Sequence, residues 1–103
     1  MAIIDRFRNI TTTFEYFEVP KSISSDFIKE FSQFIEESLK SRPGVISFNL
    51  HYSEEEETLV NYGQWKSVEA YEAFFEDKDI EQKRNQFYGR LKKVTKTKVV
   101  FAK

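Results

Sequence analysis

Two β-prone stretches, residues 45–53 and 58–66, constrain the fold of this chain more than any other feature. Their sequences, VISFNLHYS and TLVNYGQWK, are rich in the β-branched and aromatic residues that favour strands. Four glutamates, residues 54–57, separate them and form a short turn. The pair therefore predicts a β-hairpin with Ser53 opposite Thr58. Because facing residues point to the same side of a sheet, this register also predicts which side chains share a face.

One face of the predicted hairpin is apolar except for an amide and a glycine. It carries Ile46, Phe48, Leu50, Leu59, Asn61, Gly63 and Trp65. Gly63 leaves a gap opposite Phe48, and the indole N–H of Trp65 can donate a hydrogen bond but never accept one. An unpaired buried amide costs roughly 1–3 kcal/mol, so Asn61 is expected to have a partner or a function. The apolar wall, the gap and two nearby donors predict a pocket for a flat, oxygenated molecule.

The opposite face of the hairpin mixes polar and apolar side chains. It carries Val45, Ser47, Asn49, His51, Val60, Tyr62 and Gln64. This mixture is too polar for a dry core and too apolar for plain solvent, so it suits a partner's sheet. Since most soluble oligomers are twofold dimers, the pattern predicts a homodimer. His51, the only histidine, is then expected at the dimer interface and not in the pocket.

The remaining predicted strands and helices give the order of elements along the chain. We predict strands over 11–19 and 94–102 and helices over 24–41, 68–77 and 80–91. Ser24 or Ser25 is the expected N-cap of the first helix and Ser67 of the second. The order is β-α-β-β-α-β, the ferredoxin-like arrangement, in which helices cover one face of an antiparallel sheet. At 103 residues the chain is expected to be a single domain over 1–103.

Composition excludes several classes of function. Sixteen Lys and Arg against 17 Asp and Glu give a net charge of -1, which leaves no electrostatic footprint for nucleic acid or an acidic membrane. Without cysteine there is no disulfide, thiolate metal site or cysteine nucleophile. No apolar run approaches the ~20 residues of a membrane span, and Asp5 and Arg6 interrupt the N-terminus too early for a signal-peptide core. We expect a soluble, cytoplasmic protein with no bound metal.

Three other sequence features do not change this prediction. RNA-recognition domains share this element order, but TLVNYGQWK lacks their aromatic motif, so RNA binding ranks last among the possible functions. The glutamates 54–57 are expected to be solvated. The lysines at 92, 93, 96 and 98 are expected to protect an edge strand and not to bind phosphate.

The stretch PGVISFNLHYSEEEETLVNYGQWKSVEAYEAFF resembles the antibiotic biosynthesis monooxygenase (ABM) family. The matching elements are Pro43-Gly44, Leu50-His51-x-Ser53, Val60-Asn61-Tyr62-x-x-Trp65, Ser67 and Glu69-Ala70-Tyr71. The resemblance implies a dimeric α+β barrel, with two ferredoxin-like sheets face to face and a cleft between sheet and helices in each subunit. The family includes cofactor-independent oxygenases of phenolic or anthrone-like aromatics, quinol monooxygenases and haem-degrading enzymes.

The resemblance also implies site residues. By position, Asn61, Trp65 and Tyr71 fall on residues that contact substrate in the anthrone-oxidising branch, and we assign them catalytic roles. That branch uses an arginine on the later helix, and Arg84 lies one residue from its place. The haem-degrading branch needs a histidine where this chain has Phe75, so haem ligation of that kind is not expected. The predicted substrate-binding residues are Phe48, Leu50, Phe75 and Arg84.

Together these features predict a cofactor-independent monooxygenase or oxidase that uses O2 as co-substrate on a phenol, hydroquinone or anthrone. The amide of Asn61 would donate to a substrate oxygen that becomes anionic, and Trp65 would donate to substrate or to a peroxide. The alternatives are that Asn61 satisfies a backbone group and that Trp65 only packs. A non-catalytic dimer that binds an aromatic ligand or haem is the competing function.

Overall fold

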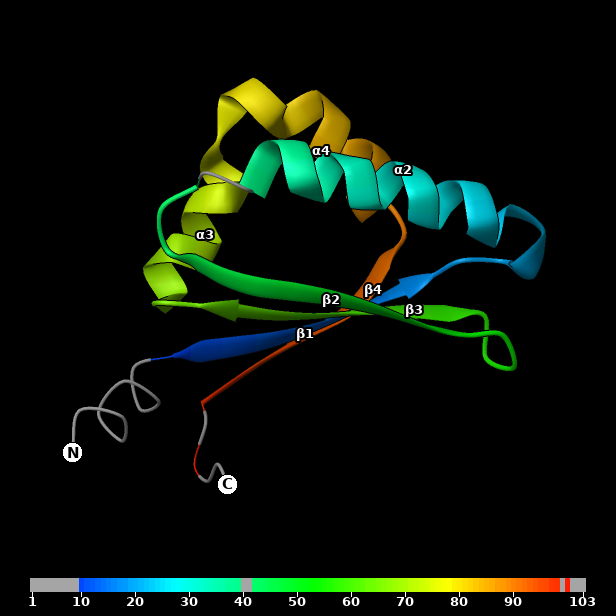
Figure 1. Cartoon of the computed structure of the whole chain (residues 1–103), viewed down its shortest axis with the longest axis horizontal. Coiled ribbons are helices and arrows are strands. Elements are labelled where there is room, and N and C mark those ends of the chain that lie inside the picture. The colour runs from blue at the N-terminus through cyan, green and yellow to red at the C-terminus, as the bar shows by residue number, and fades with distance from the viewer. Residues whose placement is uncertain (1–9, 40–41, 99, 101–103) are drawn as a thin grey trace.

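A computed structural model describes residues 10–39, 42–98 and 100 of the chain. Its elements are β1 (Thr11–Glu18), α2 (Lys21–Leu39), β2 (Val45–Ser53), β3 (Thr58–Trp65), α3 (Val68–Glu76), the 3₁₀-helix η1 (Lys78–Ile80), α4 (Glu81–Tyr88) and β4 (Leu91–Lys98). The strands form one antiparallel sheet in the order β2-β3-β1-β4. Helices α2, α3 and α4 cover one face of this sheet (Figure 1). The predicted ferredoxin-like arrangement is confirmed.

The hairpin register is confirmed over most of its length. Leu50 faces Asn61, and Phe48 faces Gly63. The prediction that Ile46 faces Trp65 is wrong, because a bulge between Val45 and Ser47 shifts the pairing. Val45 lies opposite Trp65 instead and packs against the core, while Ile46 turns outward and is 43% exposed. One extra residue in an edge strand thus exchanges the faces that Val45 and Ile46 occupy.

Helix α2 begins earlier than expected, and the acidic turn of the hairpin explains why. The backbone N–H of Lys21 donates to a carboxylate oxygen of Glu57 at 2.7 Å, so a side chain distant in sequence satisfies the helix N-terminus. Ser24 does not cap the helix, since its hydroxyl donates to the carbonyl of Lys21. All four glutamates at 54–57 are exposed, as expected, and Glu57 in addition accepts this hydrogen bond. Positions 40 and 41 of the predicted helix lie outside the described residues.

The second half of the chain follows its local signals closely. Ser67 is the N-cap of α3, and its hydroxyl accepts from the N–H of Ala70 at 3.1 Å, as predicted. The predicted helix over 80–91 is shorter in the structure and ends at Tyr88. Strand β4 begins at Leu91, three residues before the predicted start. Residues 99, 101 and 102 of that predicted strand lie outside the described part of the chain.

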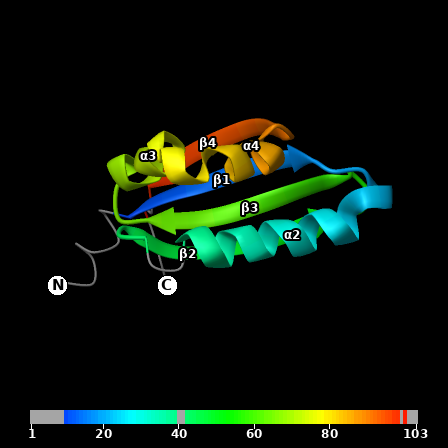
Figure 2. The same ribbon diagram turned by 90° about the horizontal axis from the view of Figure 1, so that it is seen from above.

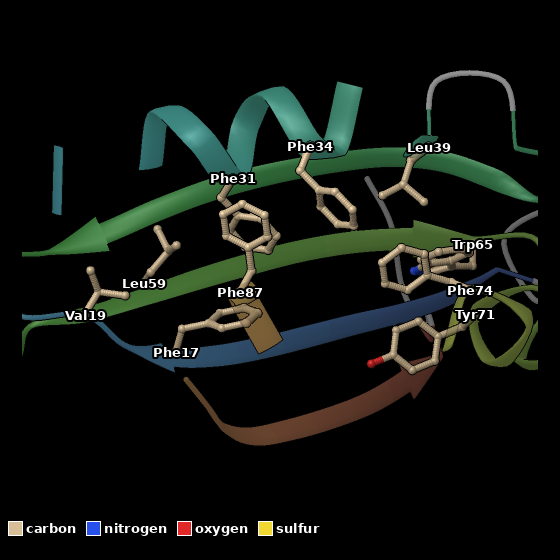
Figure 3. Packing of buried hydrophobic residues seen from close by; sticks show 10 residues of the cluster. All are labelled: Phe17, Val19, Phe31, Phe34, Leu39, Leu59, Trp65, Tyr71, Phe74 and Phe87. Atoms are coloured by element: carbon tan, nitrogen blue, oxygen red, sulfur yellow. The ribbon is translucent and has the colours of Figure 1, made fainter. Parts of the chain in front are cut away.

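The three helices lie over the sheet (Figure 2), and the core between the two layers is built largely of aromatic rings (Figure 3). Its buried members are Phe17, Val19, Phe31, Phe34, Leu39, Leu59, Trp65, Tyr71, Phe74 and Phe87. Phe17, Phe31 and Phe87 pack together beneath α2, and Trp65, Tyr71 and Phe74 form a second group beside α3 (Figure 3). Phe17 and Phe31, like Trp65 and Tyr71, meet edge to face, whereas Phe31 and Phe87 stack; both are geometries that aromatic pairs prefer.

An ion pair connects the entrance of β2 to the end of α3. The Arg42 guanidinium donates to the carboxylate of Asp77, and this contact lowers the pKa of Asp77. Arg42 also lies 5.8 Å above the centre of the Phe74 ring. The pair therefore joins the hairpin to the helical layer next to Trp65.

Candidate functional site

A glutamate lies at the centre of the buried face of the sheet. Glu15 is in β1, one of the two central strands, and its side chain is 1% exposed. Its neighbours on the same face of β1 are Thr13 and Phe17, and it faces Asn61 across to β3. Carboxylates are almost never fully buried without a partner, so the surroundings of Glu15 require an explanation.

Three side chains from three different elements donate hydrogen bonds to this carboxylate. Asn61 Nδ2 on β3 and the Tyr88 hydroxyl at the end of α4 both donate to Oε1, at 2.9 and 2.8 Å. The Tyr71 hydroxyl on α3 donates to Oε2 at 2.8 Å. The structure thus brings two predicted catalytic residues, Asn61 and Tyr71, together around Glu15. We call Glu15, Asn61, Tyr71 and Tyr88 the carboxylate cluster.

The cluster shifts the proton affinity of its members. Burial raises the pKa of Glu15, and the three donors offset only part of that effect. Burial and the nearby negative charge of Glu15 also raise the pKa values of Tyr71 and Tyr88, so both phenols keep their protons and act as donors. A carboxylate that is held by neutral donors, with a raised pKa, is a suitable proton acceptor.

Trp65 lies beside the cluster and is enclosed by rings. It is 1% exposed, and its ring centre is 5.3 Å from those of both Phe48 and Tyr71, each edge to face. Its indole N–H has no hydrogen-bond partner. The Oδ1 atom of Asn61 is also buried without a partner. Two unpaired polar atoms, one donor and one acceptor, therefore occur on the same inner face of β3.

The space predicted at Gly63 is not empty, because the ring of Phe48 occupies it. A Cβ atom built on Gly63 would lie 3.0 Å from Cε1 of Phe48 and 3.1 Å from the hydroxyl oxygen of Thr13. The prediction of an open gap is therefore wrong, although its reason holds: only glycine lets the ring approach the strand this closely. Phe48 also lines a cavity of about 410 Å³, which we call the α2–β2 cleft. The other lining residues are Ile35, Glu36, Leu39, Val45 and Ile46.

The other predicted substrate-binding residues surround the site in different ways. Phe75 contacts the rings of Tyr71 and Tyr88, with centres 5.0 and 5.3 Å away, and so borders the carboxylate cluster. Leu50 lies opposite Asn61 on β2. The guanidinium of Arg84 is buried and donates to the carbonyls of Phe74 and Asp77, where it caps the end of α3. Its part in substrate binding stays a prediction.

Neither a histidine nor a set of metal ligands accompanies this cluster. His51 is exposed on β2, on the face opposite the helices. Within residues 10–39, 42–98 and 100, no three His, Asp or Glu side chains are grouped so as to hold a metal ion. No helix in the described part of the chain is long and apolar enough to cross a membrane.

Sequence reasoning missed Glu15 and Tyr88, although both left a signal. In TTTFEYFE, alternation puts Glu15 on the same face as Phe17, so a charge stands at an inward position of a central strand. Tyr88 follows Arg84 by four residues and Phe87 by one, which places it at the margin of the inner face of α4. The sequence could not predict that these two side chains form a hydrogen bond, because the residues are 73 positions apart.

The family of the chain follows from its sequence as well as its fold. The profile of the antibiotic biosynthesis monooxygenase family matches residues 12–84, a segment that contains the whole carboxylate cluster except Tyr88. The chain belongs to this family. Comparison with curated proteins gives no match.

Several solved structures share the fold of this ABM chain. SnoaB, a cofactor-independent oxygenase from Streptomyces nogalater, superposes with a TM-score of 0.76 at 11% identity, covering 91% of this chain and 96% of SnoaB. A conserved protein from Methanosarcina mazei gives 0.75 at 15% identity, covering 92% and 97%. The haem-degrading protein of Mycobacterium tuberculosis gives 0.69 at 20% identity, covering 90% and 93%. At these identities the likeness shows the fold, and family and neighbours together support a monooxygenase-like function.

Proposed function

We propose that this protein is a cofactor-independent monooxygenase that oxidises a small, electron-rich aromatic of the phenol, hydroquinone or anthrone type with O2. The observation that carries the proposal is the carboxylate cluster. Such a reaction needs a base that can take a proton from a weak acid, and Glu15 is a buried carboxylate whose pKa is raised. The cofactor-independent oxygenase SnoaB has the same fold.

The proposed reaction balances without any redox group from the protein. For an anthrone-type CH2 group, Glu15 accepts one proton, and the carbanion passes one electron to O2. The substrate radical and superoxide then combine, which forms a C–O bond. The resulting peroxide takes the proton back, and loss of water breaks the O–O bond and the remaining C–H bond. One oxygen atom enters the new carbonyl, and the other leaves as water.

Each neighbour of Glu15 has a separate task in this scheme. Tyr71 and Tyr88 hold the carboxylate in place and, with raised pKa values, stay protonated while it changes charge. Asn61 fixes the same oxygen atom as Tyr88. The unpaired N–H of Trp65 donates to the substrate oxygen on which charge develops. A preorganised donor of this kind lowers a barrier by about 3 kcal/mol in a dry site.

The competing functions of the same fold are ligand binding without turnover and haem binding. A haem iron needs an axial ligand. Helix α3 places Phe74 beside Trp65 and Phe75 beside Phe74 and Tyr71, and Phe75 is at the position where the haem-degrading branch of the family needs a histidine. His51 is on the far face of the sheet. The side chains around Trp65 therefore do not fit a histidine-ligated haem, which favours the cofactor-independent reaction.

The test is O2 consumption by the purified protein with a panel of hydroquinones and anthrones. We expect uptake with at least one compound, one carbonyl formed per O2, and a loss of kcat of about 10²–10⁴-fold in Glu15→Gln, the usual contribution of a general base. Glu18→Gln is the matched control, since Glu18 is exposed on the same strand. Binding of the panel without uptake would instead support a ligand-binding protein, and a Soret band on haem titration would support a haem protein.

We also propose that the uncovered face of the sheet binds a second copy of the chain. Phe14, Tyr16, Val60 and Tyr62 lie on this face and are only half-buried. The rings of Phe14 and Tyr62 meet edge to face with centres 5.1 Å apart. A row of apolar side chains along two central strands, with no helix of the described chain above it, favours a twofold dimer (Figure 1).

A further inference from the structure

We infer that the ring of Phe48 occupies the substrate's place, and that a planar aromatic ligand binds over Gly63 by displacing it into the α2–β2 cleft. This inference rests on the proposed function, because it names the binding position within that same site. Phe48 then controls whether the ligand can reach Gly63. The sequence predicted only that Phe48 contacts the substrate.

The position of Phe48 on the sheet is the first support. Phe48, Gly63 and Thr13 face one another across β2, β3 and β1, and the Phe48 ring lies directly on the bare backbone of Gly63. The cross-strand set of residues with a glycine at its centre is thus the one on which an aromatic ring lies. A planar ligand in place of the Phe48 ring would contact the same backbone surface at Gly63.

The unpaired polar atoms are the second support. Asn61 and Trp65 flank Gly63 on the inner face of β3, and both are 1% exposed. Asn61 Oδ1 and Trp65 Nε1 have no partners, and the phenyl ring of Phe48, whose centre is 5.3 Å from that of Trp65, has no polar atom to supply one. Each unpaired buried group has a desolvation penalty, which a ligand with matching polar atoms would remove.

The cluster also determines which polar atoms the ligand needs. Because Asn61 donates from Nδ2 to Glu15, its oxygen is the atom left free. The site therefore offers one acceptor, from Asn61, and one donor, from Trp65, instead of the two donors that the sequence suggested. The complementary ligand is a planar ring with a hydroxyl group toward Asn61 and a carbonyl or second oxygen toward Trp65.

The surroundings of Phe48 allow it to move. It is half-buried in an edge strand, close to the bulge between Val45 and Ser47. It already lines the α2–β2 cleft, whose volume of about 410 Å³ is large enough to receive a phenyl ring. No main-chain hydrogen bond of the hairpin need break for a side-chain rotation of this kind.

The experiment measures binding without O2, so that it is independent of turnover. The probe is para-hydroxyacetophenone, which has a donor and an acceptor on one ring, and the signal is the quenching of Trp65, the only tryptophan. Removing the ring in Phe48→Ala should lower the Kd of the probe roughly tenfold, since the binding-competent state is then always populated. Phe48→Leu should give an intermediate Kd. Phe27→Ala, which removes another half-buried ring that packs against Phe31 and Phe87, should leave the Kd unchanged.

Two further measurements test the contact with Gly63 and the hydrogen bond from the ligand to Asn61. Gly63→Ala in the Phe48→Ala background should weaken probe binding again, because its methyl group fills the ring's place. Para-methoxyacetophenone, which has no donor for Asn61, should bind at least tenfold more weakly than the hydroxy compound. An unchanged or higher Kd in both folded Phe48 variants would overturn the inference. Probe binding that follows this pattern, together with no O2 uptake from any hydroquinone or anthrone of the panel, would leave the inference standing and reject the oxygenase.

Discussion

At the scale of single residues, Glu15 is unusual because its partners are neutral. Three hydroxyl or amide donors contact it, and none of the ion pairs in the described part of the chain includes it. A cation at this place would lower the pKa of the carboxyl and weaken it as a base. Neutral donors keep the carboxylate oriented while burial keeps its proton affinity high. This combination distinguishes a proton acceptor from a structural salt bridge.

The raised pKa of Glu15 predicts how stability depends on pH. Because the folded-state pKa is above the unfolded value, the favourable contribution is complete below the unfolded pKa and is lost as pH rises through the folded pKa. Glu15→Gln cannot ionise, so its free energy of unfolding should increase relative to that of the wild type as pH rises above the ordinary glutamate pKa, by at most about 1.4 kcal/mol per pH unit. Urea denaturation at a series of pH values measures this. Parallel curves, or an equal effect in Glu18→Gln, would contradict it.

At the scale of elements, local patterns in the sequence predicted what depends on neighbours along the chain. The hairpin register, the Ser67 cap and the inward side of α3 all follow from spacing and turn length, and the structure has them. The bulge at Val45 and the start of α2 were not predictable in this way. Both depend on contacts across the sheet or with a distant turn, for which periodicity has no signal.

The capping of α2 by Glu57 gives a prediction at this scale. The Lys21 N–H is one of the donors that a helix leaves unpaired at its start, and Glu57 supplies both an acceptor and a negative charge. Glu57→Ala should lower the free energy of unfolding by about 1 kcal/mol, and added salt should reduce this loss. The backbone conformation at this position, with φ of 51°, is equally unsuited to glutamate and alanine, so it adds nothing to the difference. Thermal and urea melts of Glu57→Ala beside Glu55→Ala, an exposed residue of the same turn, measure the effect.

At the scale of the whole molecule, the two faces of the sheet have separate tasks. The face under the helices holds the carboxylate cluster, Trp65 and the Phe48 ring. The other face holds half-buried rings and no helix of the described chain. The element order alone implied this division, but it could not reveal the site, because Glu15 and Tyr88 meet only when β1 lies at the centre of the sheet beneath α4. The fold could therefore be predicted from the sequence, but the carboxylate cluster could not.

The proposed dimer at the uncovered face of the sheet predicts the mass of the protein in solution. If two sheets pack face to face, light scattering should give about twice the 12.3 kDa of one chain. Tyr62→Lys places a charge at the centre of the apolar row and should shift the mass toward that of a single chain, because an unpaired charge is costly in a buried interface. Gln33→Lys, on the exposed side of α2, introduces the same charge and should stay dimeric. A single-chain mass in the wild type would reject the dimer and leave the carboxylate cluster intact, since all four of its residues come from one chain.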